Sequence, residues 1–144
     1  MVLINNLGRA VRLPVDPLRR TGSRIFAKQK TDEIIGGTSV GHEEWLWLIS
    51  SEGYTKWLNA AQVPLAQEAS AQNSSSQSTS IVRRRGELCA VISAPNTRPV
   101  WAITSTRLLP IDPNATLRVD AESIAMHKTL SLAAGEQVLG ILNG

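Results

Sequence analysis

Short apolar runs broken by turn residues are the feature that most limits how this chain can fold. The runs are rich in Val, Ile, Leu and Trp, and glycines, prolines or polar clusters separate them. Helices need apolar periodicity sustained over about ten or more residues, and it is weak here; the best candidate is residues 121–132. We therefore predict an all-β protein. The runs that read as strands are RAVRLPV, SRIFAKQ, DEIIGG, EWLWLIS, YTKWLN, ELCAVIS, PVWAITS, ATLRVD, KTLSL and QVLGIL.

Size and composition restrict the classes of protein that remain. With 144 residues, the chain fits one ordinary domain or two very small ones, and 42% hydrophobic residues are enough for a core. Cys89 is the only cysteine, which excludes an intramolecular disulfide and cysteine-based metal clusters. The net charge of +3 is well below the dense Lys/Arg content of a dedicated nucleic-acid protein.

One polar segment suggests where the chain divides. Residues 66–80, AQEASAQNSSSQSTS, contain only alanines as apolar residues. Such a segment cannot bury enough surface to offset its backbone entropy, which indicates a flexible Ser/Gln-rich linker, although one long loop inside a single domain is the alternative. We predict a first domain at residues 1–65 and a second at residues 81–144.

The tryptophan-rich stretch EEWLWLISSEGYTKWLNAAQV predicts a β-hairpin. Residues 44–50 and 54–59 alternate as two strands, and Ser51, Glu52 and Gly53 suit a three-residue loop with a left-handed glycine. In the simplest register Trp47 lies opposite Trp57. One face then carries the tryptophans and Ile49 and the other carries leucines, so a partner, a ligand or another segment must cover the second apolar face.

Residues 32–63 resemble a Src-homology-3 (SH3) domain. The matching elements are DEIIGG, the Trp45-Leu46 pair, Gly53, Trp57-Leu58 and the short turn Asn59–Gln62 before Val63. The resemblance implies a small β-barrel. The family reads proline-rich peptides with a proline and a tyrosine in that helical turn, but Asn59 and Gln62 stand there, so the peptide groove is not expected.

Residues 83–111 repeat the outline of this region and are a possible second, degenerate copy. The fold prediction is therefore two small SH3-like barrels joined by the linker, with an extended C-terminal β segment. The last run, QVLGILNG, could complete the second barrel or add a strand to a neighbouring subunit.

Catalytic and metal-binding patterns are missing. Cys89 lies in the apolar run LCAVI, where a cysteine is usually a small buried hydrophobe, and His42 beside two glutamates indicates a solvated turn. No cofactor and no metal are expected, and the protein is not expected to be an enzyme. No secretory signal and no transmembrane segment are recognisable, which predicts cytoplasmic synthesis and no membrane partner.

Three functions remain. The first is a structural assembly protein that packs against other subunits as a homo-oligomer or hetero-complex, for example as a connector, decoration or tail component of a phage virion. The second is a binding module for cell-wall or extended peptides, with Trp45, Tyr54 and Trp57 as contacts. The third is nucleic-acid binding through the arginine clusters, chiefly Arg83, Arg84 and Arg85.

Overall fold

Ten strands and the 3-10 turn Ala60–Gln62 are the named elements of the part of the chain that the structure describes. The structure is a computed structural model, and it describes residues 1–13, 33–41, 44–63, 65, 85–94, 99–112 and 127–143. The elements are β1 (Val2–Asn5), β2 (Ala10–Arg12), β3 (Ile34–Thr38), β4 (Trp45–Ser50), β5 (Tyr54–Asn59), the helical turn η1 (Ala60–Gln62), β6 (Leu88–Ala94), β7 (Val100–Thr104), β8 (Leu108–Ile111), β9 (His127–Lys128) and β10 (Val138–Asn143). The all-β prediction is confirmed.

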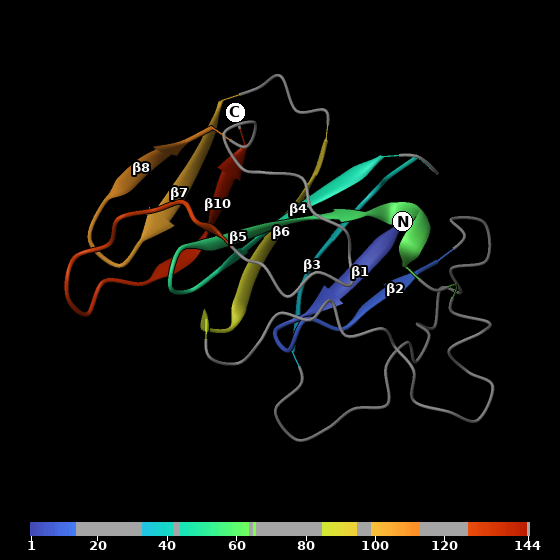
Figure 1. The fold of residues 1–144 in the computed structure, drawn as a ribbon, viewed down its shortest axis with the longest axis horizontal. Helices are drawn as coiled ribbons and strands as arrows, with labels where there is room; N and C mark the ends of the chain where they lie inside the picture. Colours follow the sequence, from blue (N-terminus) through green and yellow to red (C-terminus); the bar gives the residue numbers. More distant parts are fainter. Residues whose placement is uncertain are drawn as a thin grey trace, which may run out of the picture.

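The strands form three sheets that follow one another across the molecule (Figure 1). We name them the N-terminal sheet (β2-β1-β3), the middle sheet (β6-β4-β5-β9) and the C-terminal sheet (β10-β7-β8). Every ladder between these strands is antiparallel. The middle sheet takes strands from both sides of residues 66–80, because β6 pairs with β4 and β9 pairs with β5. The division into domains at that segment stays a prediction.

The predicted SH3-like barrels are not confirmed. The strands expected from the resemblance are present as β3, β4 and β5, but β3 pairs with β1 and the free edge of β4 is taken by β6. Among the described residues the strands make three open sheets and no closed barrel. The local sequence pattern of a Trp-rich hairpin is therefore shared by two architectures that differ in which distant strands complete the sheet.

Most other strand predictions hold. The runs predicted as strands contain β2, β3, β4, β5, β6, β7 and β10, whereas SRIFAKQ and ATLRVD lie outside the described residues. The run KTLSL is wrong for the most part, since β9 ends at Lys128. Two strands were not predicted, β1 and β8. In β8, Pro110 is tolerated because this edge strand pairs only with β7, so a missing N–H can face away from the ladder.

The central hairpin follows its predicted geometry. Trp47 lies opposite Trp57 and Leu46 opposite Leu58. Gly53 adopts a φ of 78°, the left-handed conformation that its loop requires. The predicted helical turn is the 3-10 turn Ala60–Gln62, and the Asn59 side chain caps it by accepting a 2.9 Å hydrogen bond from the Ala61 N–H.

Two separate core clusters lie on the two faces of the middle sheet. Leu46, Leu48 and Leu58 pack with residues of β1 and β2, while Trp47, Ile49 and Trp57 pack with residues of β7, β8 and β10. Both apolar faces predicted for the hairpin are therefore covered by sheets of the same chain. The C-terminal run, predicted as a possible exchanged strand, pairs with β7 of its own chain.

Candidate functional site

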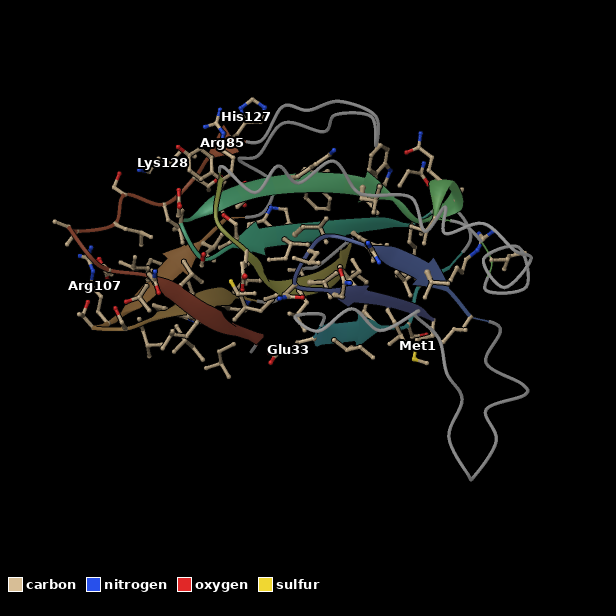
Figure 2. The ribbon with its side chains drawn as sticks, turned by 90° about the horizontal axis from the view of Figure 1, so that it is seen from below. Met1, Glu33, Arg85, Arg107, His127 and Lys128 are labelled. Carbon is tan, nitrogen blue, oxygen red and sulfur yellow. The ribbon has the colours of Figure 1, made fainter. Side chains whose placement is uncertain are left out.

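A cluster of cations surrounds one tyrosine at the turn end of the β4–β5 hairpin. The Arg85 guanidinium carbon lies 4.5 Å from the centroid of the Tyr54 ring, and the Lys128 Nζ lies 5.7 Å from it. Arg85, Lys128 and the neighbouring His127 gather at one end of the molecule (Figure 2). We call Tyr54, Arg85 and Lys128 the Tyr54 cluster.

Lys128 is positioned by the pairing of β9 with β5. In the β5–β9 ladder Tyr54 lies directly opposite Lys128, and Thr55 lies opposite His127. The Gly53 carbonyl accepts hydrogen bonds from the Thr129 and Leu130 amides at 3.1 and 3.2 Å, and the hydroxyls of Thr55 and Thr129 are hydrogen-bonded to each other. These contacts fix a short strand, 72 or more residues away in the sequence, against the edge of the hairpin.

Arg85 is positioned by the close approach of the backbone at Gly86 to the hairpin turn at Ser51. Gly86 has a φ of 81°, and a Cβ atom added there would stand 2.5 Å from the Ser51 Oγ, so only glycine fits. The next residue continues the contact, because the Glu87 carbonyl accepts a 2.7 Å hydrogen bond from the Ser51 N–H. Arg85 is thereby held beside the hairpin turn at the start of the segment that leads into β6.

The cluster presents positive charge to solvent. The side chains of Arg85 and Lys128 are exposed, while Tyr54 is half-buried and packs against the leucine side of the core. Within the part of the chain that the structure describes, neither cation forms an ion pair with a carboxylate; the described ion pair joins Arg107 and Glu136. A cation over an exposed aromatic ring gains about 0.5–1 kcal/mol, which restrains the direction of both charges without neutralising them. Such an arrangement suits an anionic ligand.

The predicted site residues separate into three groups. Tyr54 and Arg85, predicted from different parts of the sequence, are brought together. Trp57 is only 2% exposed and Trp45 is half-buried against the same core cluster, so Trp57 offers no stacking face to a ligand. Arg83 and Arg84 lie outside the described residues. Sequence reasoning missed Lys128, because nothing in the local pattern links it to the hairpin; the β5–β9 pairing does so.

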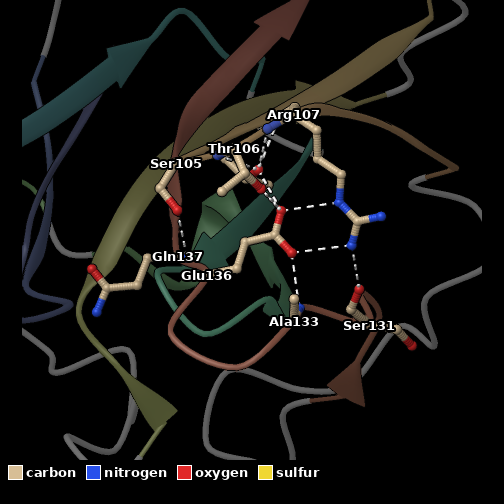
Figure 3. Close-up of polar contacts among 8 residues, drawn as sticks. Ser105, Thr106, Arg107, Ser131, Ala133, Glu136 and Gln137 are labelled. Atoms are coloured by element: carbon tan, nitrogen blue, oxygen red, sulfur yellow. Dashed lines mark hydrogen bonds and ion pairs between the residues drawn. The ribbon is translucent and has the colours of Figure 1, made fainter.

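A second polar cluster surrounds Glu136 (Figure 3). One carboxylate oxygen accepts hydrogen bonds from the Thr104 hydroxyl at 2.6 Å, the Thr106 hydroxyl at 2.8 Å and the Arg107 Nε at 3.0 Å. The other oxygen accepts from Arg107 Nη2 at 3.0 Å and from the Ala133 N–H at 2.8 Å. Both oxygens are fully used, and the Glu136 side chain is 1% exposed. This cluster ties the β7–β8 turn to the segment before β10 and leaves no acceptor for a substrate.

The ion pair and the hydrogen bonds of this cluster shift the pKa values of Glu136 and Arg107. The hydrogen bond from Arg107, followed by those from Thr104, the Ala133 amide and Thr106, holds the pKa of Glu136 well below its usual range. The same pairing raises the pKa of Arg107. Glu136 is therefore a permanent anion at neutral pH and cannot serve as a general acid or base there.

Cys89 keeps its thiol proton at neutral pH. Burial raises the pKa of the Cys89 thiol to about 12, and its Sγ donates a 3.4 Å hydrogen bond to the Ile49 carbonyl. A protonated thiol of this kind is a poor nucleophile at neutral pH. Within the described ranges no three His, Cys, Asp or Glu side chains gather to hold a metal ion.

Within the described residues, no helix has both the length and the apolar character needed to cross a bilayer.

Comparison with known proteins identifies the fold. No protein-family model matches the chain, and no curated protein matches it in sequence. Among solved structures, the C-terminal domain of DNA gyrase A aligns with 99% of this chain at 14% sequence identity and a TM-score of 0.78. The C-terminal domain of DNA topoisomerase IV aligns with 99% of it at 16% identity and a TM-score of 0.71. The chain shares the fold of these two domains.

The shared region is about half of each solved domain, because the chain spans 49% of the gyrase domain and 46% of the topoisomerase IV domain. These neighbours overturn the predicted role as a structural assembly or virion subunit. That prediction assumed that an apolar hairpin face and the C-terminal run contact other subunits. In the structure both hairpin faces are covered by the chain's own sheets, and the C-terminal run pairs with β7 of the same chain. The matched domains belong to DNA gyrase and DNA topoisomerase IV.

Proposed function

We propose that this chain binds double-stranded DNA, with Arg85 and Lys128 contacting backbone phosphates beside Tyr54. The observation that carries the proposal is the Tyr54 cluster, in which two exposed cations are oriented over one ring. The names of the two fold neighbours, DNA gyrase and DNA topoisomerase IV, agree with a DNA ligand. The sequence adds Arg83 and Arg84 immediately before Arg85.

The geometry favours phosphate contacts over base stacking. Proteins that bind single strands present free aromatic faces on which bases stack. In this chain Tyr54 is half-buried and already in contact with two cations, and Trp57 is buried in the core. The charged groups are therefore the part of the cluster that a nucleic acid can reach. Contacts of this type are independent of base sequence and depend strongly on salt.

The test is titration of a fluorescently labelled DNA duplex at several salt concentrations, read by anisotropy. We expect Arg85→Ala and Lys128→Ala each to weaken binding several-fold. Each should also reduce the slope of log affinity against log salt by about 0.9, the value for one lost phosphate contact. Tyr54→Phe keeps the ring beneath the two cations and should bind as the wild type does.

A charge-matched control separates the site from the overall charge. Ser39→Asp lowers the net charge by one, as the two alanine variants do, but at an exposed position that follows β3 in the N-terminal sheet. We expect it to leave the salt slope unchanged. If Arg85→Ala and Lys128→Ala weaken binding no more than Ser39→Asp, the Tyr54 cluster is not the DNA-binding site.

A further inference from the structure

The turn between β7 and β8 is connected to the turn between β4 and β5, which carries the Tyr54 cluster. The Ser51 carbonyl in the β4–β5 turn accepts a 2.8 Å hydrogen bond from the Val138 amide. The Gln137 carbonyl accepts a 2.9 Å hydrogen bond from the Ser105 amide in the β7–β8 turn. These two consecutive residues at the start of β10 therefore bridge a turn of the middle sheet and a turn of the C-terminal sheet.

Arg107 lies in the β7–β8 turn, at the end of the molecule that carries the Tyr54 cluster (Figure 2). Its Nη2 donates a 3.4 Å hydrogen bond to the Ser131 carbonyl. Ser131 follows Lys128 by three residues, and three residues of chain span at most about 11 Å. Each strand of a DNA duplex carries one phosphate per ~3.4 Å of helix axis. Arg107 and Lys128 can therefore reach nearby phosphates of one duplex.

The Arg107 guanidinium is held along one edge and free along the other. Its Nε and Nη2 each donate a 3.0 Å hydrogen bond to an oxygen of Glu136. The remaining nitrogen, Nη1, donates to none of the residues that the structure describes, and Figure 3 shows it pointing away from the cluster. The planar guanidinium is thus oriented before any ligand arrives, so little side-chain freedom is lost when Nη1 binds an anion.

The ion pair presents its positive side to solvent. The Arg107 side chain is 50% exposed, whereas that of Glu136 is 1% exposed. The carboxylate also accepts hydrogen bonds from the Thr104 and Thr106 hydroxyls and the Ala133 amide, so its negative charge is compensated inside the protein. A phosphate that approaches this turn meets guanidinium N–H groups. Hydrogen bonds between arginine and phosphate are charge-assisted and stronger than those between neutral groups.

We propose that Arg107 is a third phosphate-binding residue, which contacts through Nη1 the same DNA duplex that Arg85 and Lys128 contact. The inference rests on the proposed function and extends it, because the bound duplex then lies across turns of the middle and C-terminal sheets. Glu136 is a positioning residue, which orients Arg107 without touching the DNA.

The test is the same duplex titration with Arg107→Gln and Glu136→Gln combined in one chain. This double variant removes one positive and one negative charge, so the net charge stays at +3. We expect several-fold weaker binding and a salt slope reduced by about 0.9, the value for one lost phosphate contact. Attraction by net charge alone predicts no change. Circular dichroism verifies that the double variant is folded at the temperature of the titration.

Glu136→Gln alone is the matched control. It removes the same carboxylate but keeps Arg107, so we expect it to bind the duplex at least as tightly as the wild type, with an unchanged salt slope. If this single variant loses as much affinity as the double variant, the loss comes from the disturbed cluster and the third contact is wrong.

Nuclear magnetic resonance of the wild type tests the contact without any substitution. The Nε–H resonance of Arg107 should shift as the duplex is added, whereas the amide resonance of Ser39 should stay in place. An Arg107 resonance that does not move, or a folded double variant that binds as the wild type does, would overturn the third contact. If Arg85→Ala and Lys128→Ala still weaken binding, the proposed function stands without it. A wild type that does not bind the duplex would overturn both.

Discussion

Glu136 is a buried carboxylate whose contribution to stability depends on its charge. In the folded chain the Arg107 ion pair and three further donors lower its pKa, whereas in the unfolded chain the pKa is the ordinary one, near 4.5. A group with a depressed folded pKa stabilises the fold fully above its unfolded pKa. The stabilisation decreases as the pH falls from there towards the folded value.

We therefore expect Glu136→Gln to lower the melting temperature most at neutral pH, and the difference from the wild type to shrink below about pH 4.5. Thermal denaturation followed by circular dichroism between neutral pH and strongly acidic pH measures this. Glu52→Gln, a change at an exposed carboxylate in the hairpin turn, is the control and should melt close to the wild type. A difference that stayed constant down to the lowest pH would show that the loss is steric rather than electrostatic.

Single residues also show how far the site could be predicted. Tyr54 and Arg85 were identified from local signals, an aromatic in a hairpin and an arginine run. Lys128 carries no such signal, since it becomes part of the site only through pairing with a strand 74 residues earlier. Trp57 is predicted as a contact for the same reason as Tyr54, its aromatic side chain, but it lies fully inside the tryptophan cluster that the middle sheet shares with the C-terminal sheet. The sequence shows which side chains have the chemistry to contact a ligand, whereas the sheet arrangement determines which of them are exposed to it.

Gly53 joins the hairpin turn to the end of β9. Its φ of 78° is strained for any residue with a side chain, and a Cβ atom there would stand 3.0 Å from the Leu130 Cβ. Its carbonyl also accepts the Thr129 and Leu130 amides. We expect Gly53→Ala to destabilise the protein by roughly 1–2 kcal/mol through the backbone conformation, with an added loss from the contact. Urea denaturation measures the total loss in unfolding free energy from these two causes.

The share of this destabilisation that comes from backbone conformation alone can be measured at a second glycine. Gly135 has nearly the same φ, 76°, and a Cβ atom there would meet nothing within 4 Å. Gly135→Ala should therefore show the conformational loss alone. If the added methyl group pushes Leu130 and β9 away from the turn, Gly53→Ala should also weaken DNA binding, because Lys128 lies in β9. Gly135→Ala should leave DNA binding unchanged. Equal losses of stability in the two variants would mean that Leu130 yields to the methyl group.

The hairpin strands are stabilised mainly by burial of their large side chains. Trp57 is 2% exposed, lies opposite Trp47 and packs into the cluster shared with the C-terminal sheet. Truncation of such a side chain leaves a large cavity, so Trp57→Ala should cost about 3–5 kcal/mol in unfolding free energy. Chemical denaturation measures this, with Ile34→Ala as the exposed control, which we expect to lie within about 0.5 kcal/mol of the wild type. A small loss at Trp57 would contradict the packing described here.

Across the complete fold, local pattern predicts the class and most strands but not how the strands assemble into sheets. The hairpin register follows from a three-residue turn and alternation, which are local. The partners of β4, β5 and β7 come from residues 88–94, 127–128 and 138–143, and no spacing rule specifies pairs so distant in sequence. The same gap accounts for the predicted SH3-like barrels and the predicted assembly role, because local pattern shows that a face is apolar but not which distant strands of the chain cover it.

The two covered faces of the middle sheet have a consequence for how the chain selects its strand alignment. In a sheet with one solvated face, a slip of one residue is forbidden by polarity, since it would turn apolar side chains into water. In β4 a slip would only exchange Trp47 or Ile49 for Leu46 or Leu48, and all four are buried. The slip is instead prevented by the difference in side-chain volume between the two faces. Indole rings would overfill the space built for leucines and leave voids behind, so in this protein steric fit rather than solvent distinguishes the two sides of the hairpin.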